Sequence, residues 1–189
     1  NVFFFFFDKN GLSSTAYSFI AGIMEHIKGM TAITNPLVNS YKRLVPEFEA
    51  PVYIAWSAQN RSPLIRVPAS RGQGTRVELR SADPSANPYL ALAVTIAAGL
   101  DGVKRGLVPP PAVDGNIYAM SDAQRKKHKI QMLPTSLESA IAELKNDKLI
   151  CNTLGEHILE KYVEAKELEW QNYKTRISQW EIDEYLSKY

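Results

Sequence analysis

The residues of this sequence that stand out for their chemistry are arginines. Six of the nine arginines lie within residues 43–80, a stretch that contains no lysine: Arg43, Arg61, Arg66, Arg71, Arg76 and Arg80. The guanidinium group is always charged, and its fixed fork grips carboxylates and phosphates through two parallel hydrogen bonds. This preference for arginine over lysine predicts an anion-binding site.

The end of this stretch, residues 75–80, alternates charged and apolar side chains in the manner of a β-strand. Its charged face carries Arg76, Glu78 and Arg80. One interpretation is an exposed strand face beside a core face. The second joins this face to Arg61 and to Arg66, which a neighbouring antiparallel strand brings alongside. An acid among arginines then suits a phosphate-and-metal site, because the carboxylate can hold Mg²⁺ while the arginines neutralise charge during phosphoryl transfer.

Other common site patterns are absent from the sequence. Residues 72–74 read Gly-Gln-Gly, but Val77 takes the last place of a GxGxxG motif, and there is no Walker loop. The three histidines and Cys151 show neither metal-ligand nor nucleophile spacing. A nucleotide bound by this chain is therefore expected to be held by side-chain cations.

The helices that position these residues are predicted from hydrophobic spacing, caps and prolines. The first helix is expected over residues 13–29, with Ser13 or Ser14 as N-cap and Gly29 as stop. Capping boxes are expected at Thr135 with Glu138 and at Ser178 with Glu181. The other helices are expected over residues 35–44, 89–100, 135–145 and 158–177, and from residue 178 onward. The helix over 89–100 is apolar on all sides and is expected to be buried.

Strands are predicted over residues 52–57, 64–67 and 75–80, where β-branched and apolar residues are bounded by turn residues. The prolines and glutamates of residues 45–51 favour a loop, and residues 68–74 favour a turn.

Composition is that of a soluble globular protein, with 45% hydrophobic and 22% charged residues. The length of 189 residues suits one domain or a large piece of a bigger one. The longest apolar stretch is too short to span a membrane, and residues 3–7, five phenylalanines, have no basic leader typical of a signal peptide. The single cysteine favours a reducing, cytoplasmic setting. The net charge of +2 and the short basic run 125–129 do not predict nucleic-acid binding.

Most of the chain resembles the type I glutamine synthetases. The matching strings are LSSTAYSFIAG, NPLVNSYKRLVP, EAP, AQNRSPLIRVP, RVELRSADPSANPYLALA, AGLDG and GEHILEKYVEAKELEW. Members of this family are more than twice as long, so residues 1–189 are expected to be the C-terminal part of the catalytic domain, without the N-terminal β-grasp domain. The resemblance implies an α+β fold in which an antiparallel sheet is backed by helices.

The activity that the resemblance implies is the ATP-dependent ligation of ammonia to L-glutamate in nitrogen assimilation. It proceeds through a γ-glutamyl phosphate intermediate and uses Mg²⁺ or Mn²⁺. Arg43 and Arg80 fall on substrate-glutamate arginines, and Arg61 on one that contacts both glutamate and nucleotide phosphate. Glu49 falls on the flap glutamate that accepts a proton from ammonium. The remaining matches are two ATP-phosphate arginines and one metal ligand: Arg66, Arg76 and Glu78.

The family assembles as a dodecamer of two hexameric rings, and residues 160–189 match its C-terminal helices, which reach across to the opposite ring. The family's other metal glutamates are missing here, so the 189 residues alone are expected to be inactive. An alternative function is a non-catalytic module that binds nitrogen-responsive transcription regulators, as in the feedback-inhibited Gram-positive branch that residues 71–74 resemble. A third reading, an ATP-guanidino phosphotransferase, gives no reason for NRSPLIRVP and EAP to occur together.

Two positions depart from the family pattern. Tyr118 matches a tyrosine that one branch adenylylates, but Ala119 and Met120 replace the Asp-Leu pair that commonly follows it. The resemblance therefore does not predict adenylylation. Glu47 stands where most relatives have glycine, two residues before the flap glutamate, which predicts a backbone angle that glutamate reaches only with strain.

Overall fold

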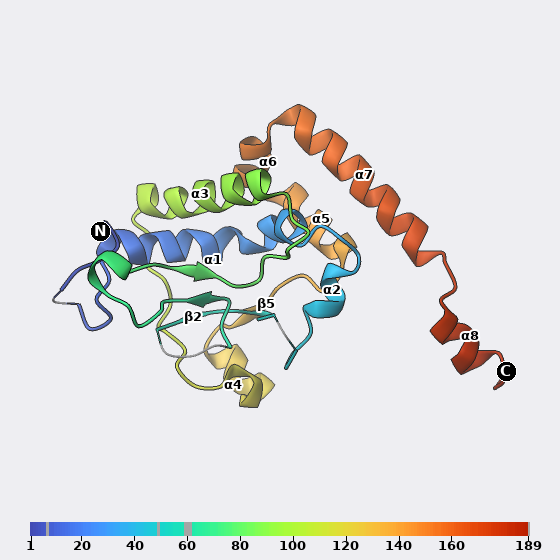
Figure 1. Cartoon of the computed structure of the whole chain (residues 1–189), viewed down its shortest axis with the longest axis horizontal. Helices are drawn as coiled ribbons and strands as arrows, with labels where there is room; N and C mark the ends of the chain where they lie inside the picture. Colours follow the sequence, from blue (N-terminus) through green and yellow to red (C-terminus); the bar gives the residue numbers. More distant parts are fainter. Residues whose placement is uncertain (7, 49, 59–61, 189) are drawn as a thin grey trace.

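The computed structural model describes residues 1–6, 8–48, 50–58 and 62–188 (Figure 1). Its helices are α1 (Ser14–Thr34), α2 (Ser40–Arg43), α3 (Pro88–Arg105), α4 (Asp122–Lys127), α5 (Leu137–Asn146), α6 (Lys148–Leu154), α7 (Glu156–Lys174) and α8 (Gln179–Tyr185). Its strands are β1 (Tyr53–Ile54), β2 (Trp56–Ser57), β3 (Ile65–Arg66), β4 (Glu78–Leu79) and β5 (Gln131–Met132). The short 3-10 turns are η1 (Gly72–Gly74) and η2 (Ile117–Ala119). The predicted α+β class is confirmed.

Helix α1 is the centre of the core and packs against α3, α5 and α6. Its N-cap is Ser13, one of the two predicted candidates, and the Ser13 hydroxyl accepts a hydrogen bond from the Ala16 N–H at 3.1 Å. The predicted stop at Gly29 is wrong, because α1 continues to Thr34. Gly29 instead permits a close approach: a Cβ there would lie 2.6 Å from the Cβ of Asp147, the N-cap of α6.

Helix α3 crosses α1 closely and leaves its opposite face open. A Cβ added at Gly102 would lie 2.1 Å from the Ser18 carbonyl oxygen, so only glycine fits at this crossing. The predicted burial of this helix on all sides is wrong. Only one face contacts the core, and the exposed residues of α3 include Tyr89, Leu92, Ile96 and Leu100.

The strands form two small sheets. Strand β1 pairs with β5 antiparallel, and β3 lies between β2 and β4. The predicted antiparallel pairing of residues 64–67 with 75–80 is confirmed, with Arg66 opposite Glu78. Strand β2, however, is parallel to β3, so this sheet is mixed. The single strand predicted over residues 52–57 is divided at Ala55, because its two halves pair in different sheets.

The other helix predictions hold in part. Residues 35–44 form only the short α2, and Asn35 ends α1 instead of opening a helix. The cap of α5 is Ser136 with Ser139, not Thr135 with Glu138, because the extended backbone of Ser136 lets its hydroxyl accept from the Ser139 N–H. The capping box that opens α8 at Ser178 is confirmed. Helices α4 and α6 were not predicted.

Helix α7 packs against α5 and α6, and the hydroxyl of its Tyr162 donates to the Ala32 carbonyl of α1 at 2.7 Å. Helix α8 follows it at the edge of the molecule (Figure 1). Exposed apolar residues lie on α8 and directly before and after it, namely Ile177, Trp180, Ile182 and Leu186. Among the described residues, no helix has both the length and the apolar character needed to cross a bilayer.

Candidate phosphate and metal site

The charged face of β3 and β4 brings one carboxylate between two guanidinium groups. Register places Arg66 directly opposite Glu78, and the Arg66 Nη1 lies 3.5 Å from the Glu78 Oε2. Arg76, two residues before Glu78, donates from Nη2 and Nε to the Glu78 Oε1 at 2.8 and 3.1 Å. The structure thus confirms that Arg66 joins the face formed by residues 75–80.

Alternation along the strand explains why this face is open. Val77 and Leu79 point the other way and pack against the hydrophobic core. The Glu78 and Arg66 side chains are 30% and 34% exposed, and Arg76 is more exposed still. Ion pairs that are this exposed to solvent contribute little to the stability of the fold. The three groups can therefore exchange partners at small cost when a phosphate or a cation arrives.

Arg80 completes the same face. Its main chain is fixed by a hydrogen bond from the Arg80 N–H to the Leu64 carbonyl at 3.0 Å, and its Nη1 donates to the Pro63 carbonyl at 3.3 Å. Its positive charge acts on the Tyr118 hydroxyl. Burial raises the pKa of Tyr118; the charge of Arg80 opposes that shift, and Glu47 adds to it. Arg80, Tyr118 and Glu47 therefore share one electrostatic environment.

Arg43, at the end of α2, reaches the segment that follows β4. Its Nη2 donates to the carbonyls of Ser81 and Ala82 at 3.1 and 3.3 Å, and its Nε lies 4.0 Å from the Asp83 Oδ2. Burial raises the pKa of the Asp83 carboxyl, but hydrogen bonds from Ser85 and Ser40 and the charge of Arg43 outweigh it and lower that pKa overall. Arg43 therefore ties α2 to the end of the charged strand.

Two buried polar atoms at the contact between Arg43 and Ser81 point to a site that is completed by something other than these side chains. Within the part of the chain that the structure describes, Arg43 Nε and Ser81 Oγ are buried and have no hydrogen-bond partner. A buried polar group without a partner costs free energy, so such groups mark places where a ligand or water is expected. Sequence analysis did not single out Ser81; its position directly after the charged strand was the only signal.

The loop before β1 carries the predicted strain. Glu47 has a φ of 65°, in the left-handed region that favours glycine, and its side chain is exposed. Glu49 and Arg61, the predicted flap base and the arginine predicted to contact both substrates, lie outside the described residues.

A divalent cation fits this face only in part. Glu78 offers the hard oxygen donor that Mg²⁺ prefers. Across residues 1–6, 8–48, 50–58 and 62–188, however, no three acidic, histidine or cysteine side chains cluster closely enough to hold a metal ion. Glu78 can therefore act as one ligand, with the others supplied by phosphate oxygens, by water or by groups outside these residues.

Comparison with known proteins agrees with this geometry. Residues 1–185 match the family described as "Glutamine synthetase, catalytic domain", and the chain belongs to that family. It is 57% identical over 182 residues to a glutamine synthetase of Clostridium saccharobutylicum, covering 96% of this chain and 41% of that protein. It is 56% identical over 187 residues to that of Thermus thermophilus, covering 97% of this chain and 42% of that protein.

A solved structure agrees with this family assignment. The structure described as a GmaS/ADP complex superposes with a TM-score of 0.85 at 34% identity, covering 99% of this chain and 43% of the other. The resemblance read from the sequence is thus confirmed for both family and fold. The chain spans about two fifths of the length of the relatives that it matches.

Proposed function

We propose that this chain forms part of the catalytic domain of an enzyme that ligates ammonia to L-glutamate with ATP and releases L-glutamine through γ-glutamyl phosphate. The observation that carries the proposal is the Glu78 carboxylate held between Arg66 and Arg76 on an open strand face. Relatives named glutamine synthetase at more than half identity support the same reaction.

In the proposed reaction Arg66 and Arg76 bind ATP phosphate oxygens, with Arg61 as a third cation. Both described arginines are paired with Glu78, so phosphate oxygens would replace the carboxylate as their partner. Glu78 is then free to ligate Mg²⁺ or Mn²⁺. A bound divalent cation supplies charge neutralisation at the transferring phosphoryl group. A relative solved with ADP supports a nucleotide at this fold.

The proposed glutamate site uses Arg43 and Arg80. Arg80 grips the substrate carboxylate with its fork, and its contact with the Pro63 carbonyl fixes the direction of the side chain. Arg43 Nε and the Ser81 hydroxyl beside it are buried and lack partners, which a polar substrate would supply. Glu49 is proposed as the base that takes a proton from ammonium, while closure of its loop keeps water from the acyl phosphate.

We propose that the enzyme is a cytoplasmic homo-oligomer, a dodecamer of two hexameric rings, and that residues 1–189 work together with a β-grasp domain. The exposed apolar side chains on α8 and beside it support a subunit contact there. Neither the described residues nor the relatives give an observation that favours the regulator-binding alternative, so it is not proposed.

The test is glutamine formation from L-glutamate, ammonium and ATP by the full-length gene product. We expect activity in the wild type, near-complete loss in Glu78→Gln and no change in Glu143→Gln, a matched change on α5. Retention of activity by Glu78→Gln would contradict the proposed role of the charged face.

A further inference from the structure

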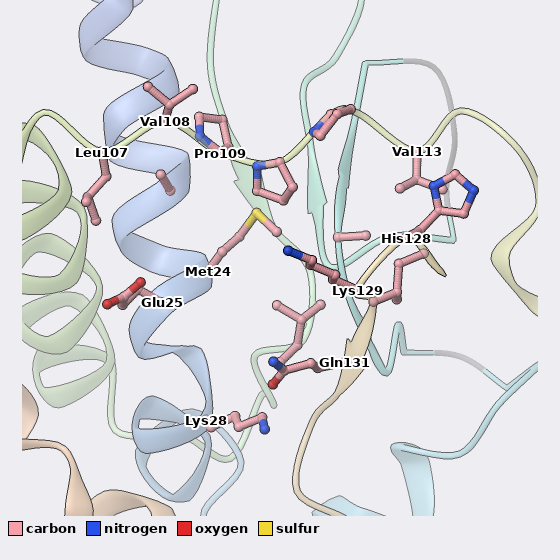
Figure 2. A pocket seen from close by; sticks show the side chains of 16 residues that line it. Met24, Glu25, Lys28, Leu107, Val108, Pro109, Val113, His128, Lys129 and Gln131 are labelled. Atoms are coloured by element: carbon pink, nitrogen blue, oxygen red, sulfur yellow. The ribbon is translucent and has the colours of Figure 1, made fainter. Parts of the chain in front are cut away.

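A cavity of about 310 Å³ lies between α1 and β1 (Figure 2). Its walls come from α1, from residues 107–113 and from residues 128–131, which lead out of α4 into β5. Cavities of this size are at the lower end of those that hold small molecules. None of the arginines of the candidate phosphate and metal site lines it.

One wall of the cavity is apolar and held in place. Met24 of α1, Ile54 of β1 and the triple proline 109–111 line it. The Trp56 indole N–H donates to the Pro110 carbonyl at 2.7 Å, and the Val113 N–H donates to the Trp56 carbonyl at 2.9 Å. The proline segment is therefore fixed to β2, so this wall does not depend on a ligand for its position.

The charged groups at the cavity are mostly cationic. Lys28 and Lys129 line it, and neither forms an ion pair with any described residue. The acid at the cavity, Glu25, is paired with Arg105 at 3.3 Å. Figure 2 shows the Lys129 side chain reaching toward α1, with the Glu25 carboxylate and the Lys28 ammonium apart from it. The cavity therefore combines an apolar wall with uncompensated positive charge.

Lys129 adopts a left-handed backbone conformation, which is unfavourable for a lysine. Lys129 has a φ of 54°, and the Ile130 N–H donates to the Arg125 carbonyl at 3.0 Å, which closes α4 in a turn whose left-handed position usually holds glycine. A lysine there adds strain, which persists at positions whose side chain serves a function. Here the strained residue is the one that places an ammonium in the cavity.

We propose that this cavity binds a small organic carboxylate, with its anionic group at Lys129 and its apolar body against Met24 and the triple proline. The inference is independent of the ligase reaction, because it concerns a separate site and its test measures binding.

The test uses the full-length gene product at pH 7.5 with saturating L-glutamate, which occupies the proposed substrate arginines. Calorimetry and ligand-observed NMR follow benzoate, benzamide and acetate. Benzoate has both an apolar ring and a carboxylate, whereas benzamide lacks the charge and acetate lacks the ring. We expect benzoate to bind at least about fivefold more tightly than either control.

Variants assign the binding to the cavity. Lys129→Gly should weaken benzoate binding at least about threefold while raising the melting temperature, because it removes both the charge and the strain. Lys28→Gln should weaken binding less than Lys129→Gly does, Lys129→Arg should preserve it, and Lys127→Gln, a control on α4 outside the cavity, should leave it unchanged. Equal affinity for benzoate and benzamide, binding of acetate as tight as benzoate, no benzoate binding, or unchanged binding in Lys129→Gly would each overturn the proposal.

Discussion

Replacing Glu47 by glycine should both relieve strain and change the charge near the proposed substrate site. Glu47 holds a φ of 65°. A left-handed conformation costs an L-residue about 1–2 kcal/mol. Glycine avoids that cost, but it raises the conformational entropy of the unfolded chain, which offsets about 0.4–1 kcal/mol of the gain. The net expected gain is therefore on the order of 0.5–1 kcal/mol in the free energy of unfolding.

The charge of Glu47 adds a second effect. The side chain is exposed and its negative charge raises the pKa of Tyr118, which Arg80 also influences. Removing it should lower the Michaelis constant for glutamate, because an anionic substrate is then repelled less. Salt screens exposed charges over about 10 Å at 0.1 M, so this effect should shrink at high salt.

Comparing Glu47→Gly with Glu47→Gln separates the two effects, because glutamine removes the charge and keeps the strain. Calorimetry should place the melting temperature of Glu47→Gly above that of Glu47→Gln by roughly 1–3 °C. Steady-state kinetics at low and high salt should show both variants with a lower Michaelis constant for glutamate at low salt. Equal melting temperatures would refute the strain argument, and kinetics like wild type at both salts would refute the electrostatic one.

Three further predictions concern other residues. Arg80→Lys should raise the Michaelis constant for glutamate and cost about 1.5–3 kcal/mol, because a point charge cannot replace a fork; a constant within twofold of wild type with activity intact would contradict this. Hydrogen bonds to Asp147 and Asp101, at 2.8 and 3.1 Å, raise the pKa of His26. The stabilising effect of His26 should therefore be complete below about pH 6.5 and fade as pH rises through the raised pKa. The free energy of unfolding of His26→Gln, measured with denaturant, should differ most from wild type at pH 6, and a difference that grows towards pH 9 would contradict this. The 189 residues alone should give no γ-glutamyl transfer, because Glu78 cannot hold the metal without further carboxylates, and turnover above blank would defeat this.

The charged face could be predicted from sequence because its causes are local. Alternation along residues 75–80 places Arg76, Glu78 and Arg80 on one side, and the short connection from residue 67 to 75 favours an antiparallel return that brings Arg66 opposite Glu78. The N-cap at Ser13 depends in the same way on residues three positions apart. Such features need no knowledge of the rest of the fold.

Features that depend on distant parts of the chain could not be predicted. Gly29 looked like a stop signal, but its neighbour is Asp147, which belongs to a helix more than a hundred residues later. The apolar pattern of α3 does not indicate which face α1 covers, so its exposed side could not be foreseen. Helix α6 was missed because its cap, Asp147, directly follows the end of α5, which leaves no loop to separate two helices.

The most direct test of the central claim is a Mn²⁺ titration, followed by electron paramagnetic resonance, of the full-length gene product and its Glu78→Gln variant. The amide keeps the shape of the side chain but loses the charge that a hard cation prefers. We predict weaker Mn²⁺ binding in Glu78→Gln with a melting temperature close to wild type, since the Glu78 ion pairs are solvent-exposed. An unchanged titration midpoint would contradict the assignment and leave residues 75–80 as an exposed strand face without a metal role.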